Sequence, residues 1–192
     1  MIGSLKRSNM VIKKRQAYFS ERFSQEHHVL LEKITLFFKN EFQSCLIGQA
    51  DIKVVLPAYL AEWGWRGSVD EFLAYWFESE REIDVRITEG VRQLRRQGMR
   101  CYLVSDNEKE RAAYLMNTVG LASSFDGAFF SYQLGTKKSS PEFFAKILRQ
   151  LKVDSGHVWY WDDDEKNVEV AKRMGIDSHL YNDFEVFKNA IL

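Results

Sequence analysis

The chain has 192 residues, a length that suits one domain with a sizeable insertion. Lysine and arginine number 27, as do aspartate and glutamate, so no net charge draws the chain to nucleic acid or to a membrane surface. No run of about eighteen apolar residues predicts a membrane span, and the start lacks the apolar stretch of a secretory signal.

The first thirteen residues are poor material for a buried strand. A polar run at positions 6–9 precedes the apolar pair Val11 and Ile12, and no aspartate occurs before Asp51. A strand buried on both faces of a parallel sheet is almost continuously apolar. We therefore expect no such strand over residues 5–12.

Residues 14–82 carry a helical pattern, with apolar side chains at mixed three- and four-residue spacing. A helix is expected over residues 50–60, and another begins at Ser68, where Glu71 completes a capping box. Five aromatic residues here favour core packing, with a substrate-facing wall as the alternative: Trp63, Trp65, Tyr75, Trp76 and Phe77.

From residue 85 onward, helical and strand-like segments alternate, which favours a parallel, doubly wound sheet. An amphipathic helix is expected over residues 87–97. The two cysteines, Cys45 and Cys101, have neither metal-binding spacing nor a C-x-x-C arrangement. This pattern is typical of the reducing cytoplasm and predicts structural thiols.

Polar residues follow the strand expected over residues 100–104. Ser105, Asp106 and Asn107 come directly after it, and a helix is expected over residues 108–119. A hydroxyl at a strand's end, beside the free N–H groups of a helix start, can hold a phosphate or carboxylate. The simpler alternative is that Ser105 only caps the helix.

A second candidate is Lys138, in the segment GTKKSSPEFF at residues 135–144. Pro141 marks the start of a helix directly after this loop. A lone lysine in such a loop is usually only solvated. Near a carboxylate cluster, however, it can neutralise a transferring phosphoryl group.

The strand expected over residues 158–161 runs into three consecutive carboxylates, Asp162, Asp163 and Asp164. Adjacent carboxylates repel each other unless a cation or hydrogen bonds compensate, and hard oxygen ligands of this kind suit Mg²⁺. The alternative is a solvated acidic turn in which Asp164 caps the next helix.

These three segments, in this order, resemble the haloacid dehalogenase-like hydrolase superfamily. Ser105 matches the hydroxyl motif of the family, and Lys138 matches its lysine motif. Asp162 and Asp163, with Asn167, match the acidic motif of the form D-D-x-x-x-N-V-x-x-A. Together these matches are specific.

The resemblance implies an α/β fold with a Rossmann-like parallel sheet at residues 85–192 and a small helical cap at residues 14–84. It implies Mg²⁺-dependent hydrolysis of a small phosphate ester, so that the expected partner is a small phosphorylated metabolite in the cytoplasm. The sequence indicates no oligomeric state.

The resemblance also implies a role for each matching residue. Asp163 would be a Mg²⁺ ligand supported by Asp162 and Asn167, and Ser105 and Lys138 would hold the phosphoryl group. The expected substrate contacts are Asp106, Asn107 and, from the cap, Arg66.

The first motif of the family is missing. Members begin with an apolar strand ending in D-x-D-G, whose first aspartate attacks phosphorus and whose second serves as general acid and base. If Val11 and Ile12 match the apolar pair after this motif, Lys6 and Ser8 stand at the two aspartate positions. We therefore predict residues 1–13 as a degenerate remnant of the first core strand, impaired activity, and weak or absent Mg²⁺ binding.

Two hypotheses remain open from the sequence. The chain is an enzyme whose start is lost through a misplaced start or a frameshift, or it is a non-catalytic binding or regulatory protein. Translation of the DNA upstream of Met1 distinguishes them. If the slot of the first strand is empty, unpaired backbone groups predict marginal stability or rescue by a partner strand.

Overall fold

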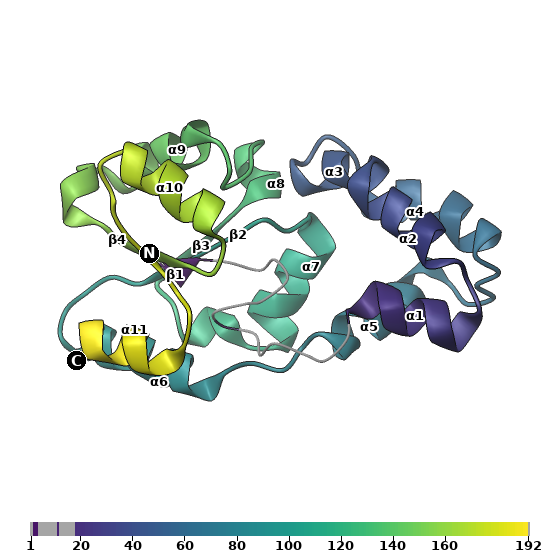
Figure 1. The fold of residues 1–192 in the computed structure, drawn as a ribbon, viewed down its shortest axis with the longest axis horizontal. Helices are drawn as coiled ribbons and strands as arrows, with labels where there is room; N and C mark the ends of the chain where they lie inside the picture. Colours follow the sequence, from purple (N-terminus) through teal and green to yellow (C-terminus); the bar gives the residue numbers. More distant parts are fainter. Residues whose placement is uncertain (1, 4–10, 12–17, 192) are drawn as a thin grey trace.

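The computed structural model describes residues 2–3, 11 and 18–191, which form two regions side by side (Figure 1). The first region contains the helices α1 (Phe19–His27), α2 (Leu31–Lys39), α3 (Glu41–Leu46), α4 (Ile52–Glu62) and α5 (Val69–Ser79). The second is an α/β region. In the part of the chain described, no helix is both long enough and apolar enough to cross a membrane.

A five-stranded parallel sheet forms the centre of the α/β region. Its strands are β1 (Ile2–Gly3), β2 (Tyr102–Ser105), β3 (Gly127–Phe130), β4 (Trp159–Asp162) and β5 (Asp177–Leu180). They lie in the order β3-β2-β1-β4-β5, and every neighbouring pair is parallel. The predicted α/β class with a parallel sheet is confirmed.

Helices cover both faces of the sheet. They are α6 (Val85–Arg96), α7 (Lys109–Ala113), α8 (Ser131–Leu134), α9 (Pro141–Leu151), α10 (Glu165–Arg173) and α11 (Phe184–Ile191). Successive strand residues point to opposite faces. Leu103 and Trp161 therefore pack in the cluster of α6 and α11, whereas Val104 and Tyr160 pack in that of α9 and α10 (Figure 1).

The helical region has a hydrophobic core of its own, rich in aromatic rings. The ring of Phe72, which is fully buried, contacts four others: Phe19, Phe23, Trp63 and Trp65. Trp63, Trp76 and Phe77 are also buried in this core. These contacts favour core packing over a substrate-facing wall, and the division of the chain at residue 84 stays a prediction.

Short-range signals predicted several helix ends correctly. Ser68 caps α5 in a capping box, because the Glu71 N–H donates to Ser68 Oγ (3.2 Å) and the Ser68 N–H donates to Glu71 Oε2 (2.6 Å). Asp164 caps α10, its carboxylate accepting the Lys166 N–H at 2.9 Å. Pro141 is at the first position of α9.

The helix predicted over residues 108–119 is not a continuous α-helix. After α7 the chain forms a π-helical stretch, Tyr114–Thr118. The Tyr114 hydroxyl donates to Glu78 (2.9 Å), and its ring lies 5.3 Å from that of Phe77. The change of helix type thus coincides with a contact to α5, a tertiary effect for which the apolar spacing carries no signal.

The slot between β2 and β4 is not empty. Ile2 pairs with Leu103 on one side and with Trp161 on the other, so the condition of an empty slot, from which we predicted marginal stability, is not met. Our prediction considered residues 5–12, whereas the pairing comes from two residues ahead of the polar run. Of residues 5–12 only Val11 is described; it is buried, and its carbonyl accepts the Asp84 N–H (2.7 Å).

Candidate functional site

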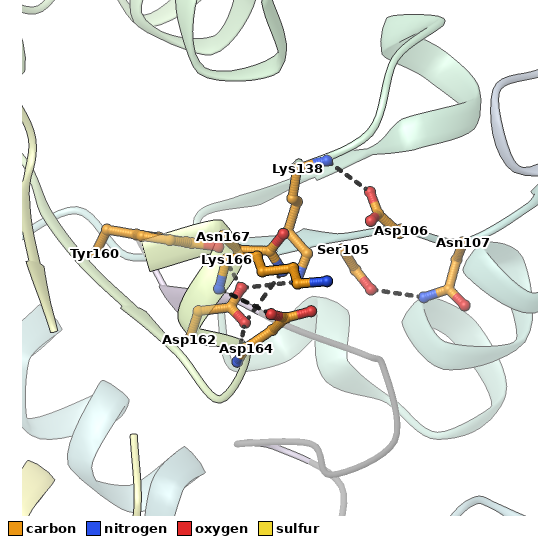
Figure 2. Close-up of polar contacts among 9 residues, drawn as sticks. All are labelled: Ser105, Asp106, Asn107, Lys138, Tyr160, Asp162, Asp164, Lys166 and Asn167. Atoms are coloured by element: carbon orange, nitrogen blue, oxygen red, sulfur yellow. Dashed lines mark hydrogen bonds and ion pairs between the residues drawn. The ribbon is translucent and has the colours of Figure 1, made fainter. Parts of the chain in front are cut away.

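Three chain segments meet at the carboxyl ends of β2 and β4 (Figure 2). Ser105 is the last residue of β2, Asp162 is the last residue of β4, and Lys138 lies in the loop between α8 and α9. All three have 0% exposure. The structure therefore brings the three predicted motifs into one buried polar cluster.

A buried ion pair forms the centre of this cluster. Lys138 Nζ lies 2.7 Å from Asp162 Oδ2, which also accepts the Tyr160 hydroxyl. Asp162 Oδ1 accepts the Asp164 N–H (2.8 Å) and the Asn167 side-chain amide (3.3 Å). Burial opposes ionisation, but the charge of Lys138 and the hydrogen bonds outweigh it and lower the pKa of Asp162. Asp162 is thus a carboxylate held by its donors.

The turn after β2 supplies a second set of hydrogen bonds. The Asn107 side-chain amide donates to Ser105 Oγ at 2.7 Å, which leaves the hydroxyl proton of Ser105 for another acceptor. Asp106 Oδ1 accepts the backbone N–H of Lys138 (2.9 Å) and so ties the lysine loop to β2. The alternative that Ser105 caps the next helix is wrong, because Glu108 caps α7.

The expected magnesium ligands fit the structure only in part. Asp163 is half-buried beside the cluster, while Asp162 and Asn167 bond to each other. Among the residues described, no group of three His, Cys, Asp or Glu side chains is arranged to hold a metal ion. Mg²⁺ usually combines one or two carboxylates with water. The described residues therefore do not complete a metal site, and the role of Asp163 as a Mg²⁺ ligand stays a prediction.

Arg66 lies apart from this cluster. It is exposed in the turn between α4 and α5, and within the described residues no hydrogen bond or ion pair joins it to Ser105, Lys138 or Asp162. Its role as a substrate contact stays a prediction.

Sequence reasoning missed Tyr160, a fully buried residue whose hydroxyl donates to Asp162. Burial, with the nearby carboxylate of Asp162, raises its pKa well above the usual value, so that the phenol stays protonated and remains a donor. A signal was available: Tyr160 precedes Asp162 by two residues in one strand, and side chains at that spacing share a face.

The helical region contacts the α/β region close to the lysine loop. Lys137 Nζ donates to Gln43 Oε1 at 2.9 Å. Gly48, with φ +71°, packs so closely on the Tyr132 carbonyl that an added Cβ would overlap it. The helical region therefore reaches the loop that carries Lys138.

The fold is a parallel sheet covered by helices with a helical insertion, and a serine, a lysine and paired aspartates lie at its carboxyl edge, where α/β folds of this kind bind their ligands. The sequence agrees, because the family model described as haloacid dehalogenase-like hydrolase matches residues 13–175. This chain belongs to the haloacid dehalogenase-like hydrolase family.

The individual relatives that match share little sequence identity with this chain. The sesquiterpene phosphatase astK of Aspergillus oryzae is 28% identical over 93 residues, which is 48% of this chain and 47% of the phosphatase. The chain thus matches about half of the length of that relative.

Solved structures share the fold at low sequence identity. A haloacid dehalogenase family enzyme of Bacteroides thetaiotaomicron, in complex with magnesium and inorganic phosphate, superposes with a TM-score of 0.78 and 19% identity, over 93% of this chain and 91% of that one. A predicted family hydrolase of Porphyromonas gingivalis gives 0.76 and 16%, over 98% and 95%.

Proposed function

We propose that this chain binds a small phosphate ester at the carboxyl edge of its sheet and hydrolyses it slowly or not at all. In this proposal Ser105 and Lys138 hold the phosphoryl group, and Asp163 binds Mg²⁺ weakly with the support of its neighbours. The ester is a small phosphorylated metabolite of the cytoplasm, contacted by Asp106, Asn107 and Arg66.

One observation carries the proposal: an ordered cluster of Ser105, Lys138 and Asp162 lies beside a first strand that brings no carboxylate. β1 lies between β2 and β4, the two strands that end in Ser105 and Asp162. The first acidic residue in the sequence is Glu21. A carboxylate nucleophile on this strand, which would form a phosphoryl-enzyme intermediate, is therefore missing.

The remaining side chains can position a phosphoryl group but cannot replace that nucleophile. Lys138 has three N–H donors, one of which bonds to Asp162, and its positive charge attracts a negatively charged phosphate. Ser105 Oγ accepts from Asn107, and among the described residues no base takes its proton. Because Lys138 is fully enclosed, neighbouring groups must move before a ligand contacts it.

The relatives support a phosphate ligand. One carries the name of a phosphatase, and the Bacteroides enzyme was crystallised with magnesium and inorganic phosphate. An aspartate-to-alanine mutant of the same enzyme was also obtained in complex with magnesium and inorganic phosphate. Loss of an aspartate is thus compatible with retained binding in that protein.

An assay with 4-nitrophenyl phosphate and Mg²⁺ tests the catalytic part. We expect a turnover many powers of ten below a normal family rate, because loss of a covalent nucleophile typically costs that much in rate while positioning alone leaves a residual rate. In parallel, inorganic phosphate should raise the melting temperature, and Ser105→Ala should abolish this shift. A normal family rate that disappears in Asp163→Asn, but not in the matched control Asp164→Asn, would contradict the proposal.

The second candidate is a purely regulatory binding protein, favoured because hydrogen bonds and an ion pair hold Ser105, Lys138 and Asp162 in place without a nucleophile. Phosphate binding with no detectable turnover at any Mg²⁺ concentration supports this candidate. A slow turnover that rises with Mg²⁺ supports the impaired enzyme.

A further inference from the structure

Arg111, on α7, is a buried cation at the junction of the two regions. It is 5% exposed, and α7 lies on the side of the α/β region nearest α5 (Figure 1). Its Nη1 donates to the Phe77 carbonyl (3.0 Å) and its Nη2 to the Glu80 carbonyl (2.8 Å). The chain passes from α5 to α6 through residues 80–84, so these two bonds hold the point where this connection begins.

The carboxyl end of α5 needs a cation from outside the helix. The last four carbonyls of an α-helix have no partner within it, and the helix dipole makes this end negative. Within the described helix α5, the last turn has no basic residue and carries Glu78, with Glu80 directly after it. Glu78 pairs with Arg81, which is exposed, whereas Nη2 of the buried Arg111 lies 3.7 Å from Glu80 Oε2. Arg111 suits this position because the planar fork of a guanidinium can serve two acceptors at once.

Aromatic rings from both regions hold the guanidinium. Its Cζ lies 5.1 Å from the ring centroid of Phe77, in α5, and 5.6 Å from that of Tyr114, which follows α7. The backbone of Arg111 is fixed as well, because its N–H donates to Glu108 Oε1 (2.6 Å). Cation–π contacts are stronger where water is excluded. The side chain therefore has little freedom to leave the two carbonyls.

Two other polar contacts between the regions are easier to displace. Lys137 forms one hydrogen bond with Gln43, and Lys53 of α4 pairs with Glu110 at 3.3 Å near the surface. Exposed ion pairs stabilise little, because water competes for both charges. The contacts of Arg111 are instead multiple, buried and directed at backbone atoms, so they are suited to fix an orientation.

We infer that Arg111 is the positioning residue that fixes the orientation of helices α1–α5 on the α/β region, by clamping the carboxyl end of α5. This orientation also places α3 against the loop that carries Lys138. Removal of the guanidinium should leave the two hydrophobic cores intact and let the helical region tilt. The inference concerns the protein without ligand, so it holds whether or not the chain binds phosphate.

Distances between pairs of spin labels, measured by double electron–electron resonance, test the inference. One label replaces Lys39, in α2, and the other replaces Gln150, in α9, or Asn189, in α11; all three residues are exposed. Because α9 and α11 cover opposite faces of the sheet, a tilt changes at least one distance. The natural Cys45 and Cys101 are buried, which raises the pKa of both thiols, to about 11 for Cys45, so neither should take the label.

Both distance distributions should be narrow in the natural chain and should broaden or shift in Arg111→Met. The matched control is Arg95→Met, because Arg95 also bonds to a carboxylate and to a backbone carbonyl, but within the α/β region. It should leave both distributions unchanged. Broad distributions in the natural chain, or distributions in Arg111→Met that equal the natural ones, overturn the inference.

Two further variants keep the test decisive. Arg111→Lys keeps the charge but not the planar fork, so it should broaden the distributions less than Arg111→Met. If Arg111→Met does not fold, as judged by circular dichroism, distributions in Arg111→Lys that equal the natural ones overturn the inference.

Glu80→Gln separates the backbone contacts of Arg111 from its ion pair. The variant removes the charge of Glu80 but keeps its carbonyl and a side-chain oxygen for the Trp76 N–H. It should leave both distributions unchanged. Broadening as large as that in Arg111→Met would assign the effect to the carboxylate and overturn the clamp at the carbonyls.

Discussion

The helical region and the α/β region bury different kinds of side chain. In α1–α5 the buried side chains are apolar, with Ser79 as the polar exception among the described residues. The α/β region buries several ionisable side chains, among them Asp84, Asp106, Glu108, Arg111, Lys138 and Asp162.

Because of this difference, the stability of each region depends on a different kind of interaction. Burial of apolar surface is non-directional and roughly proportional to area, so the aromatic core of α1–α5 should tolerate changes of pH. A buried charge is favourable only when a specific partner compensates it. The α/β region should therefore respond strongly to the loss of single polar partners and to protonation.

The largest expected effect comes from breaking the buried ion pair. Lys138→Met leaves Asp162 enclosed without its cation, and removal of one partner of such a pair costs about 3–5 kcal/mol. Urea unfolding of the variant measures this loss in the free energy of unfolding.

The neighbouring Lys137→Met is the matched control, because it removes a hydrogen bond to Gln43 in a partly buried position and should cost about 1 kcal/mol. The double variant Lys138→Met with Asp162→Asn should recover part of the loss. A cost of Lys138→Met no larger than that of Lys137→Met would remove the contrast between the two regions.

Much of the fold and of this cluster could be predicted from the sequence. Parallel strands that end in Ser105 and Asp162 bring their last residues to one edge of the sheet, and that topology follows from the alternation of helical and strand patterns. The capping box at Ser68 is equally local, since its two partners are three residues apart.

Other features depend on contacts between distant segments. The π-helical stretch at Tyr114 meets α5, and Arg95 near the end of α6 pairs with Asp126. The pairing of Ile2 joins residues about one hundred and more positions apart, and two residues are too few for a periodic pattern. Short-range patterns cannot anticipate such contacts.

A smaller effect should follow from the pH dependence of Glu108. It is 2% exposed at the start of α7, and burial raises its pKa to about 7 from 4.5, against the opposing hydrogen bonds from the Glu110 and Arg111 N–H groups. The folded state therefore binds a proton more tightly than the unfolded state. Stability should fall as the pH rises from about 4.5 to 7, by roughly 3 kcal/mol in total.

Glu108→Gln removes this titration while keeping a side-chain oxygen for the cap. Unfolding by urea at pH 5, 6, 7 and 8 should show a falling free energy for the natural chain and a flatter profile for the variant. Glu62→Gln, at an exposed carboxylate of α4 paired with Lys33, should keep the natural profile. Parallel profiles for Glu108→Gln and the natural chain would show that Glu108 is not held protonated.

The smallest expected effect lies in the helical region, at the cap of α5. Ser68→Ala removes the oxygen that accepts the Glu71 N–H and should cost about 1 kcal/mol. The control Ser20→Ala lies within α1, where no hydrogen bond of the serine hydroxyl is seen among the described residues, and should stay within about 0.5 kcal/mol of the natural chain. The ring of His27 stacks on Phe23 in the aromatic core, so the comparison is made in a His27→Gln background. There the cost of Ser68→Ala should be equal at pH 6 and pH 8, because the hydrogen bonds from Ser68 lower the pKa of Glu71 and keep the carboxylate of the cap ionised. A cost that differs between these pH values would mean that protonation in the α/β region, at Glu108 first of all, reaches α5 through contacts such as that of Tyr114 with Glu78, so that the two regions unfold as one pH-sensitive unit.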